Sequence, residues 1–125
     1  MKSVLVVDDD ADMRLTLRLA LQLAGYRVDE AANGREALER QRAAPADIII
    51  TDIFMPESDG FEAIDGLRKQ FPQTRIVAIS GGAQLTKRDY LPDAALVGAD
   101  ATLQKPFDIE ELLKTLERLD QSATR

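Results

Sequence analysis

The stretch "VLVVDDDADMR", Val4–Arg14, decides the fold class of this 125-residue chain. Four apolar residues run directly into three aspartates. A short, β-branched apolar run is typical of a buried strand, whereas adjacent carboxylates repel one another and gain nothing from a core. The stretch therefore predicts a buried strand followed by a group of carboxylates that serves a function rather than the core.

The composition limits what the chain can do. It has 16 Lys and Arg residues against 22 Asp and Glu residues, a net charge of −6, so we expect no direct nucleic-acid binding. It has no cysteine and no histidine, which leaves carboxylates, hydroxyls, lysine or a metal ion for chemistry. No apolar run suits a signal peptide or a membrane span. We expect one cytoplasmic domain over residues 1–120 and a short C-terminal tail over 121–125.

Short β-branched runs alternate with helical patterns along the chain. Alternation of this kind implies right-handed crossovers and a parallel sheet that helices cover on both faces. The fold class is therefore α/β, a doubly wound (βα)5 domain in which the first and third strands are central and buried on both sides. The five predicted strands are "SVLVV" at 3–7, "YRVDEA" at 26–31, "DIIIT" at 47–51, "RIVAI" at 75–79 and "ATL" at 101–103.

Three helices have clear signals. Apolar residues at helical spacing predict one helix over 59–71 and another over 109–119. Asn33 and Glu36 form a capping box that begins a helix in "REALERQRAA". Between residues 80 and 97 the pattern is weakest.

The segment after the first strand, "LTLRLALQLA" at 15–24, alternates apolar and polar residues with a period of two, which by itself favours a strand. We predict a helix because the segment has one β-branched residue and also a helical apolar stripe that Gly25 ends. Asp10 fits the cap of this helix. Arg14 is interpreted as a surface arginine in a salt bridge rather than as part of the acidic site.

Polar residues suited to chemistry follow four of the predicted strands. They are Asp8 and Asp9, Asp52, Ser80 and Lys105. The carboxyl ends of parallel strands share one edge, where ligands bind in such folds. Three carboxylates brought together favour Mg²⁺, which prefers oxygen ligands and accompanies phosphate. An aspartate there can act as a nucleophile toward a phosphoryl group, while the Ser80 hydroxyl and the Lys105 ammonium neutralise its other oxygens.

The motifs "VLVVDDD", "DIIITDIFMPESDG", "IVAISGG" and "GADATLQKPF" resemble the response regulator receiver domain of two-component signalling, from about Ser3 to Leu119. The resemblance implies a flavodoxin-like strand order, 2-1-3-4-5. It implies that Asp52 accepts a phosphoryl group from a histidine kinase or a histidine phosphotransfer protein. Such a domain is a switch that catalyses only its own phosphorylation and dephosphorylation, and a downstream protein partner reads its state.

The resemblance also assigns metal ligands. Asp9 and Asp52 would bind Mg²⁺ directly, and the backbone carbonyl of Phe54 would bind it as well. Asp8 would hold the ion through water. Phe54 is bulky and lies next to the metal, so we expect it to hinder the attacking water and lengthen the life of the phosphoaspartate.

Two further residues carry roles that the resemblance implies. Lys105 would contact the phosphoryl group, and Ser80 would move to bond it on arrival. Three residues before Lys105, the family usually has a tyrosine or phenylalanine that reports phosphorylation, whereas this chain has Thr102. We therefore expect the switch to work through loop movement around Ser80–Tyr90.

Other functions stay open at this point. The same signals fit a stand-alone single-domain receiver and the receiver portion of a longer regulator or hybrid kinase. A Mg²⁺-dependent phosphatase with an aspartyl nucleophile needs an acid two residues after it, where this chain has Phe54. A flavin-binding electron carrier needs a hydroxyl-rich phosphate loop where this chain has three aspartates. A docking module of the same fold would have no use for the intact acid, serine and lysine set.

Overall fold

The computed structural model of the chain describes residues 2–52, 54–55, 58–80, 98–104 and 107–123. Its centre is a sheet of five parallel strands in the order β2-β1-β3-β6-β7, which is 2-1-3-4-5 when the strands of this sheet are counted along the chain. The predicted fold class and strand order are confirmed. The strands are β1 (Ser3–Val7), β2 (Arg27–Ala31), β3 (Ile48–Asp52), β6 (Arg75–Ser80) and β7 (Ala101–Gln104).

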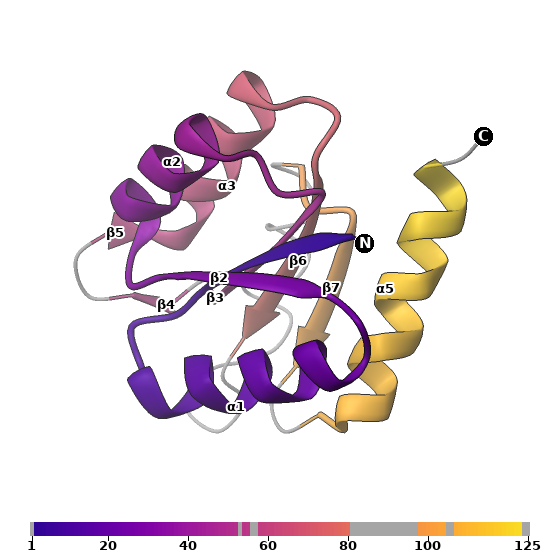
Figure 1. Ribbon diagram of the computed structural model, residues 1–125. Coiled ribbons are helices and arrows are strands. Elements are labelled where there is room, and N and C mark those ends of the chain that lie inside the picture. Colours follow the sequence, from indigo (N-terminus) through magenta and orange to yellow (C-terminus); the bar gives the residue numbers. More distant parts are fainter. Residues whose placement is uncertain (1, 53, 56–57, 81–97, 105–106, 124–125) are drawn as a thin grey trace.

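Four helices that the structure describes cover the two faces of the sheet (Figure 1). On one face lie α2 (Gly34–Ala43) and α3 (Gly60–Gln70). On the other lie α1 (Ala11–Leu23) and α5 (Ile109–Ala123). No helix among the described residues is long and apolar enough to cross a bilayer. Residues 81–97, most of the segment in which the sequence pattern is weakest, lie outside the described residues.

The central strands supply side chains to a core on each face. In β3 alternate residues point to opposite sides, so Ile49 packs with Leu67 of α3 while Ile50 packs with Leu112 of α5. Every residue of β3 is buried, as the prediction of a strand covered on both faces requires. Each such side chain stabilises the fold by about 1.5–3 kcal/mol through its burial.

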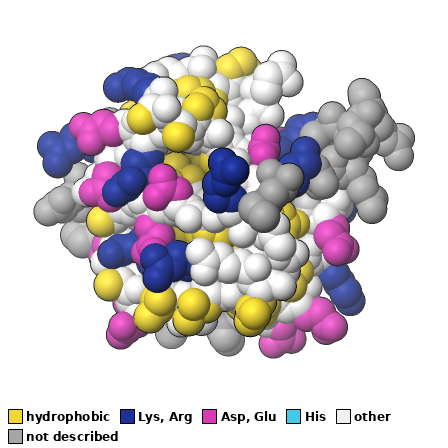
Figure 2. Space-filling model, viewed as in Figure 1, with side chains coloured by type: hydrophobic (Ala, Val, Ile, Leu, Met, Phe, Trp, Pro, Cys, Tyr) yellow, Lys and Arg dark blue, Asp and Glu magenta, His cyan; other side chains and the backbone are white. Residues whose placement is uncertain are grey.

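The structure explains the strand-like period in the first helix. Leu17 and Leu21 of α1 are buried, whereas Leu15, Leu19 and Leu23 are 44%, 52% and 90% exposed. Residues four apart share a helix face and residues two apart lie on opposite faces. The helix prediction is confirmed, and the period of two arises because a second apolar stripe runs along the outer face. Figure 2 shows apolar side chains gathered along the lower edge of the molecule, over α1.

Two short strands were not predicted. β4 (Phe54–Met55) pairs with β5 (Ser58–Asp59) in antiparallel fashion, with Phe54 opposite Asp59. The turn residues of "PESDG" indicate a turn but give no sign of paired strands around it. The pair folds the chain back soon after β3 and leads into α3.

Buried polar side chains fix the amino end of the sheet. Gln41 of α2 has no exposed surface, and its amide group donates to the carbonyl of Ala46 at 3.0 Å and to the hydroxyl of Thr74 at 3.1 Å. Its carbonyl accepts from the Ala46 amide at 2.8 Å. Each bond satisfies a group that would be costly to bury alone. Gln41 therefore ties α2 to the segments that enter β3 and β6.

Arg68 of α3 holds the entry to β7. Its Nε and Nη2 donate to the carbonyl of Gly98 at 3.1 and 2.8 Å, and its Nη1 donates to the carbonyl of Thr74 at 2.8 Å. Nη2 also pairs with Asp100, whose carboxylate accepts from the Ile76 amide at 2.8 Å. Arg68 thus joins α3 to the segments that enter β6 and β7.

Candidate metal centre

The carboxyl ends of β1 and β3 bring three carboxylates together. The two strands are neighbours in the sheet, and Val7 pairs with Thr51, so Asp8 and Asp52 follow at the same level. One carboxylate oxygen from each of Asp8, Asp9 and Asp52 lies within 4.8 Å of the other two. The predicted convergence of these three residues is therefore present in the structure.

The environment of the cluster suits a cation. Asp8 and Asp52 are 3% and 6% exposed, while Asp9 is open to solvent. Buried carboxylates need hydrogen bonds or a cation to offset their lost hydration and their mutual repulsion. Three hard oxygen donors, of which two are buried and one is open, could hold a divalent ion that keeps part of its water shell. The residues therefore fit a metal ion.

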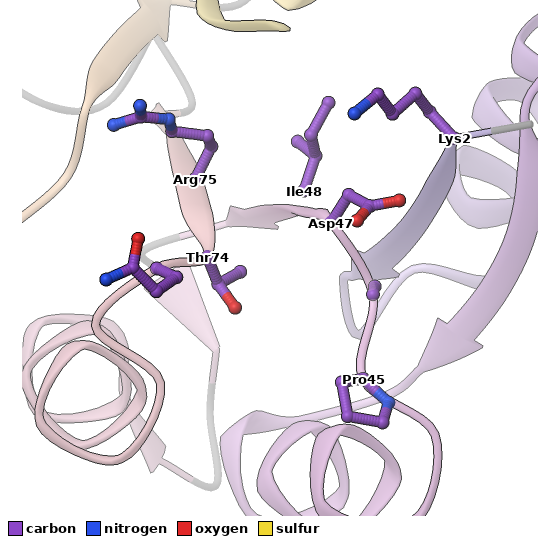
Figure 3. A pocket seen from close by; sticks show the side chains of 8 residues that line it. Lys2, Pro45, Asp47, Ile48, Thr74 and Arg75 are labelled. Carbon is purple, nitrogen blue, oxygen red and sulfur yellow. The ribbon is translucent and has the colours of Figure 1, made fainter. Parts of the chain in front are cut away.

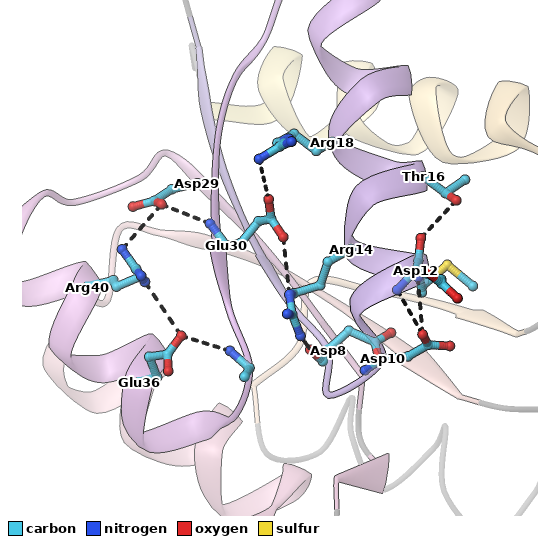
Figure 4. A network of polar contacts seen from close by, with 12 residues as sticks. Asp8, Asp10, Asp12, Arg14, Thr16, Arg18, Asp29, Glu30, Glu36 and Arg40 are labelled. Atoms are coloured by element: carbon cyan, nitrogen blue, oxygen red, sulfur yellow. Dashed lines mark hydrogen bonds and ion pairs between the residues drawn. The ribbon is translucent and has the colours of Figure 1, made fainter.

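Hydrogen bonds shape the segment between β1 and α1. The Asp8 amide donates to the carbonyl of Ala31 at 3.1 Å, which extends the pairing of β1 with β2. The Asp8 carboxylate accepts from the Asp10 amide at 2.9 Å. Asp10 caps α1, as predicted, because its carboxylate accepts from the amides of Asp12 and Met13 at 2.9 and 3.4 Å (Figure 4). Asp10 therefore serves the helix, while Asp8 and its neighbour Asp9 belong to the cluster.

Arg14 lies beside the cluster as well as in a salt bridge. Its Nε donates to Glu30 at 3.1 Å, so the predicted ion pair is present, and its Nη1 donates to the backbone carbonyl of Asp8 at 2.5 Å (Figure 4). Arg18 donates to the second oxygen of Glu30 at 2.7 Å. Sequence reasoning missed this set of contacts. The four-residue spacing of the two arginines on one helix face is the signal that could have indicated it.

One of the two predicted phosphoryl contacts, Ser80, has its backbone at the same edge of the sheet. Ser80 is the last residue of β6 and follows Ile79, which pairs with Asp52. Ser80 itself pairs with Gln104, the last residue of β7. The backbone of Ser80 thus reaches the edge where the carboxylates lie. Lys105 follows Gln104 in the sequence and lies outside the described residues, as does the predicted switching loop after Ser80.

Two further positions bear on the predicted roles. The backbone of Phe54, the predicted carbonyl ligand, begins β4 two residues after Asp52. Its side chain lies outside what the structure describes, so its effect on the attacking water stays a prediction. Thr102 lies within β7 opposite Ala78 and is half-buried.

A hollow lies at the opposite edge of the sheet, with a volume of about 250 Å³ (Figure 3). Its lining includes charges of both signs, from Lys2, Asp47 and Arg75. Asp47 accepts from the amide and hydroxyl of Ser3 at 3.0 and 3.2 Å, and Arg75 faces Asp100 at 3.7 Å. Because charges of one sign do not converge there, the acidic cluster is the stronger candidate site.

Comparisons with known proteins agree with this geometry. A family model described as "Response regulator receiver domain" matches residues 4–117, which include all three carboxylates. The response regulator receiver protein CpdR of Brucella abortus is 36% identical over 119 residues, which cover 95% of this chain and 97% of CpdR. The solved chemotaxis protein CheY4 of Vibrio cholerae is 40% identical, with a TM-score of 0.84 over 94% of this chain and 98% of that one. The response regulator protein TrrA of Thermotoga maritima, solved in complex with Mg²⁺ and BeF, is 33% identical, with a TM-score of 0.83 over 95% of this chain and 99% of TrrA.

Proposed function

The chain belongs to the response regulator receiver domain family, and from this premise we propose that it is a phosphorylation-controlled switch. Asp52 accepts a phosphoryl group from the phosphohistidine of a histidine kinase or a histidine phosphotransfer protein. The observation that carries this proposal is the convergence of Asp8, Asp9 and Asp52 within 4.8 Å at the carboxyl edge of the sheet. Ligands bind at this edge in open α/β folds.

The proposed ion is Mg²⁺, with Asp9 and Asp52 as direct ligands, Asp8 acting through water and the Phe54 carbonyl as a further ligand. Hard oxygen donors and an open side that keeps waters suit this ion, and it commonly accompanies phosphate. When bound, it supplies positive charge for the phosphoryl oxygens. The complex of TrrA with Mg²⁺ and BeF supports the same pairing here.

The residues of the chain orient the transfer. Asp52 is the last residue of a fully buried strand, so its backbone is fixed in position before the donor arrives. One of its oxygens forms the new P–O bond while the P–N bond of the phosphohistidine breaks, and the electron pair stays on the imidazole nitrogen. Ser80 and Lys105 contact the phosphoryl oxygens and stabilise their charge. The later attack of water on the phosphoaspartate releases phosphate and restores the carboxylate.

The output follows from the added charge. The phosphorylated side chain carries about −1.5 to −2 charges and three strong acceptor oxygens on phosphorus, where the Asp52 carboxylate carried one negative charge. Ser80 moves to bond one of these oxygens, and β6 and the loop after it shift with it. The chain catalyses only its own phosphorylation and dephosphorylation, and a downstream protein partner in the cytoplasm reads the altered surface.

Intact-protein mass spectrometry tests the proposal. The wild-type chain is incubated with acetyl phosphate, with and without Mg²⁺, beside Asp52→Ala and the control Asp12→Ala, which removes an exposed carboxylate outside the cluster. We expect one phosphoryl adduct that requires both Mg²⁺ and Asp52 and that Asp12→Ala retains. Binding of beryllofluoride, a phosphoryl mimic, is measured in parallel. A wild-type chain that gains no adduct and binds no mimic would refute the proposal.

A further inference from the structure

We propose that Arg14 is a positioning residue for the metal site. It holds the peptide unit between Asp8 and Asp9 in the orientation that presents the Asp9 carboxylate to the ion, and Glu30 and Arg18 hold Arg14 in turn. This inference rests on the proposed Mg²⁺ site and concerns how the chain builds it.

The first step is the contact between Arg14 and the backbone. Its Nη1 donates to the carbonyl of Asp8 at 2.5 Å. That carbonyl and the Asp9 amide belong to one planar peptide unit, so fixing one fixes the other. The Asp8 amide is already bound to the carbonyl of Ala31 at 3.1 Å. The backbone is therefore held on both sides of Asp8, and Arg14 fixes the orientation of the peptide unit that precedes Asp9.

The second step is what holds Arg14. Its Nε donates to one oxygen of Glu30 at 3.1 Å, and Arg18 donates to the other at 2.7 Å. The side chains of Arg14 and Glu30 are 19% and 25% exposed, so the pair is largely shielded from water. Glu30 lies on β2 opposite Val6 of β1, which places its carboxylate on a rigid element. The contacts join α1, β1 and β2 around the first metal ligands (Figure 4).

The third step is the geometry of the guanidinium. Its N–H groups point in fixed directions within one plane, so Nε and Nη1 can serve Glu30 and the Asp8 carbonyl at once. A lysine ammonium is a single point charge on a flexible stem and cannot reproduce two bonds with this fixed geometry. Arg14→Lys therefore keeps the positive charge but no longer orients the peptide unit between Asp8 and Asp9.

Charge and positioning give opposite expectations, which makes the inference testable. A cation near a Mg²⁺ site repels the ion, so a pure charge effect predicts that Arg14→Met tightens Mg²⁺ binding and that Arg14→Lys leaves it unchanged. Positioning predicts that both variants weaken it. Partners that orient metal ligands typically contribute 10–100-fold to affinity. We expect about a tenfold loss for Arg14→Lys, at the lower end of that range.

The experiment is a calorimetric titration of the metal-free protein with Mg²⁺. The variants are Arg14→Lys, Arg14→Met and Glu30→Gln, and the control is Arg40→Lys on α2. Arg40 also bridges two acids, Asp29 at 3.4 Å and Glu36 at 3.7 Å, but these contacts lie away from the cluster. The control should keep wild-type affinity. Thermal unfolding without Mg²⁺ is measured for each variant, because a purely structural role would lower this temperature and leave the Mg²⁺ affinity intact.

Each outcome has a defined meaning. Wild-type affinity in Arg14→Lys, or tighter binding in Arg14→Met, overturns the inference. If the Arg14 variants fail to fold, Glu30→Gln decides, since the loss of its charge should loosen Arg14 and weaken Mg²⁺ binding, and unchanged affinity overturns the inference. Failure of the proposed function is a separate result, in which the wild-type chain itself binds no Mg²⁺ or Asp9→Asn binds it as well as the wild type.

Discussion

Replacing Asp9 by asparagine should stabilise the metal-free protein, because it removes repulsion between like charges in the acidic cluster. Asp9 has its carboxylate within 4.8 Å of those of Asp8 and Asp52. Asn keeps the shape of the side chain and removes the charge. The variant therefore loses two repulsive interactions at almost no cost in packing.

The magnitude follows from the distance and the exposure. At 4.8 Å a pair of like charges repels by about 0.9 kcal/mol in water and by about 3.5 kcal/mol at an effective dielectric constant near 20. Asp9 is exposed, so the lower figure applies, and two pairs give a gain of about 2 kcal/mol. For a domain of this size that gain raises the unfolding temperature by about 5–8 °C. Added salt should shrink the difference, since it screens exposed charges.

Saturating Mg²⁺ should make the wild-type chain unfold at a higher temperature than Asp9→Asn. A ligand that binds only the folded state at 100 times its dissociation constant stabilises it by about 2.7 kcal/mol. The wild-type chain gains this amount, whereas Asp9→Asn lacks a proposed direct ligand and gains little. The assay is thermal unfolding followed by circular dichroism, in a chelator and then in Mg²⁺. The wild-type curve should lie below that of the variant in the chelator and above it in Mg²⁺.

The control is Asp12→Asn, which removes an exposed carboxylate from the first turn of α1. Negative charge in the first turn interacts favourably with the helix dipole. The free energy of unfolding of this variant should therefore fall by about 0.3–1 kcal/mol, both in the chelator and in Mg²⁺. If Asp9→Asn unfolded at a lower temperature than the wild type in the chelator, the carboxylates would not repel as the geometry requires. Equal responses of both proteins to Mg²⁺ would remove Asp9 from the proposed ligands.

Three further predictions concern the fold and are checked by urea unfolding. Gln41→Leu leaves the buried groups that Gln41 binds without a hydrogen-bond partner. It should therefore lower the free energy of unfolding by about 2–4 kcal/mol. Gly98→Ala should lower the free energy of unfolding by about 1–3 kcal/mol, because φ of Gly98 is +121° and a Cβ there would lie 3.0 Å from the Arg68 side chain. A variant as stable as the wild type would contradict that strain. Leu17→Ala should lower the free energy of unfolding by about 2–5 kcal/mol, and Leu19→Ala should lower it by less than about 0.5 kcal/mol, because only Leu17 is buried. Equal losses in the two variants would contradict the orientation of α1.

Some parts of this molecule could be predicted from the sequence because they depend on local pattern. The sheet follows from five short apolar runs, and the convergence of Asp8 and Asp52 follows once their strands are adjacent and parallel. The contact of Arg14 with Glu30 could not be predicted in the same way. It depends on the register that sets Glu30 opposite Val6 and on the rotation of α1 about its axis, and both are fixed by packing rather than by spacing.

The two edges of the sheet differ in how their polar groups are satisfied, and the difference bears on function. At the amino edge Gln41 and Arg68 bind backbone groups of neighbouring segments, so that edge gains stability from internal hydrogen bonds. At the carboxyl edge three carboxylates lie close together, and their mutual repulsion favours the binding of a cation. A fold built this way would keep its strands fixed from one edge while the other edge responds to the proposed cation and phosphoryl group. The repulsion among the three carboxylates therefore favours the proposed cation, and that cation would in turn offset the negative charge of a phosphoryl group.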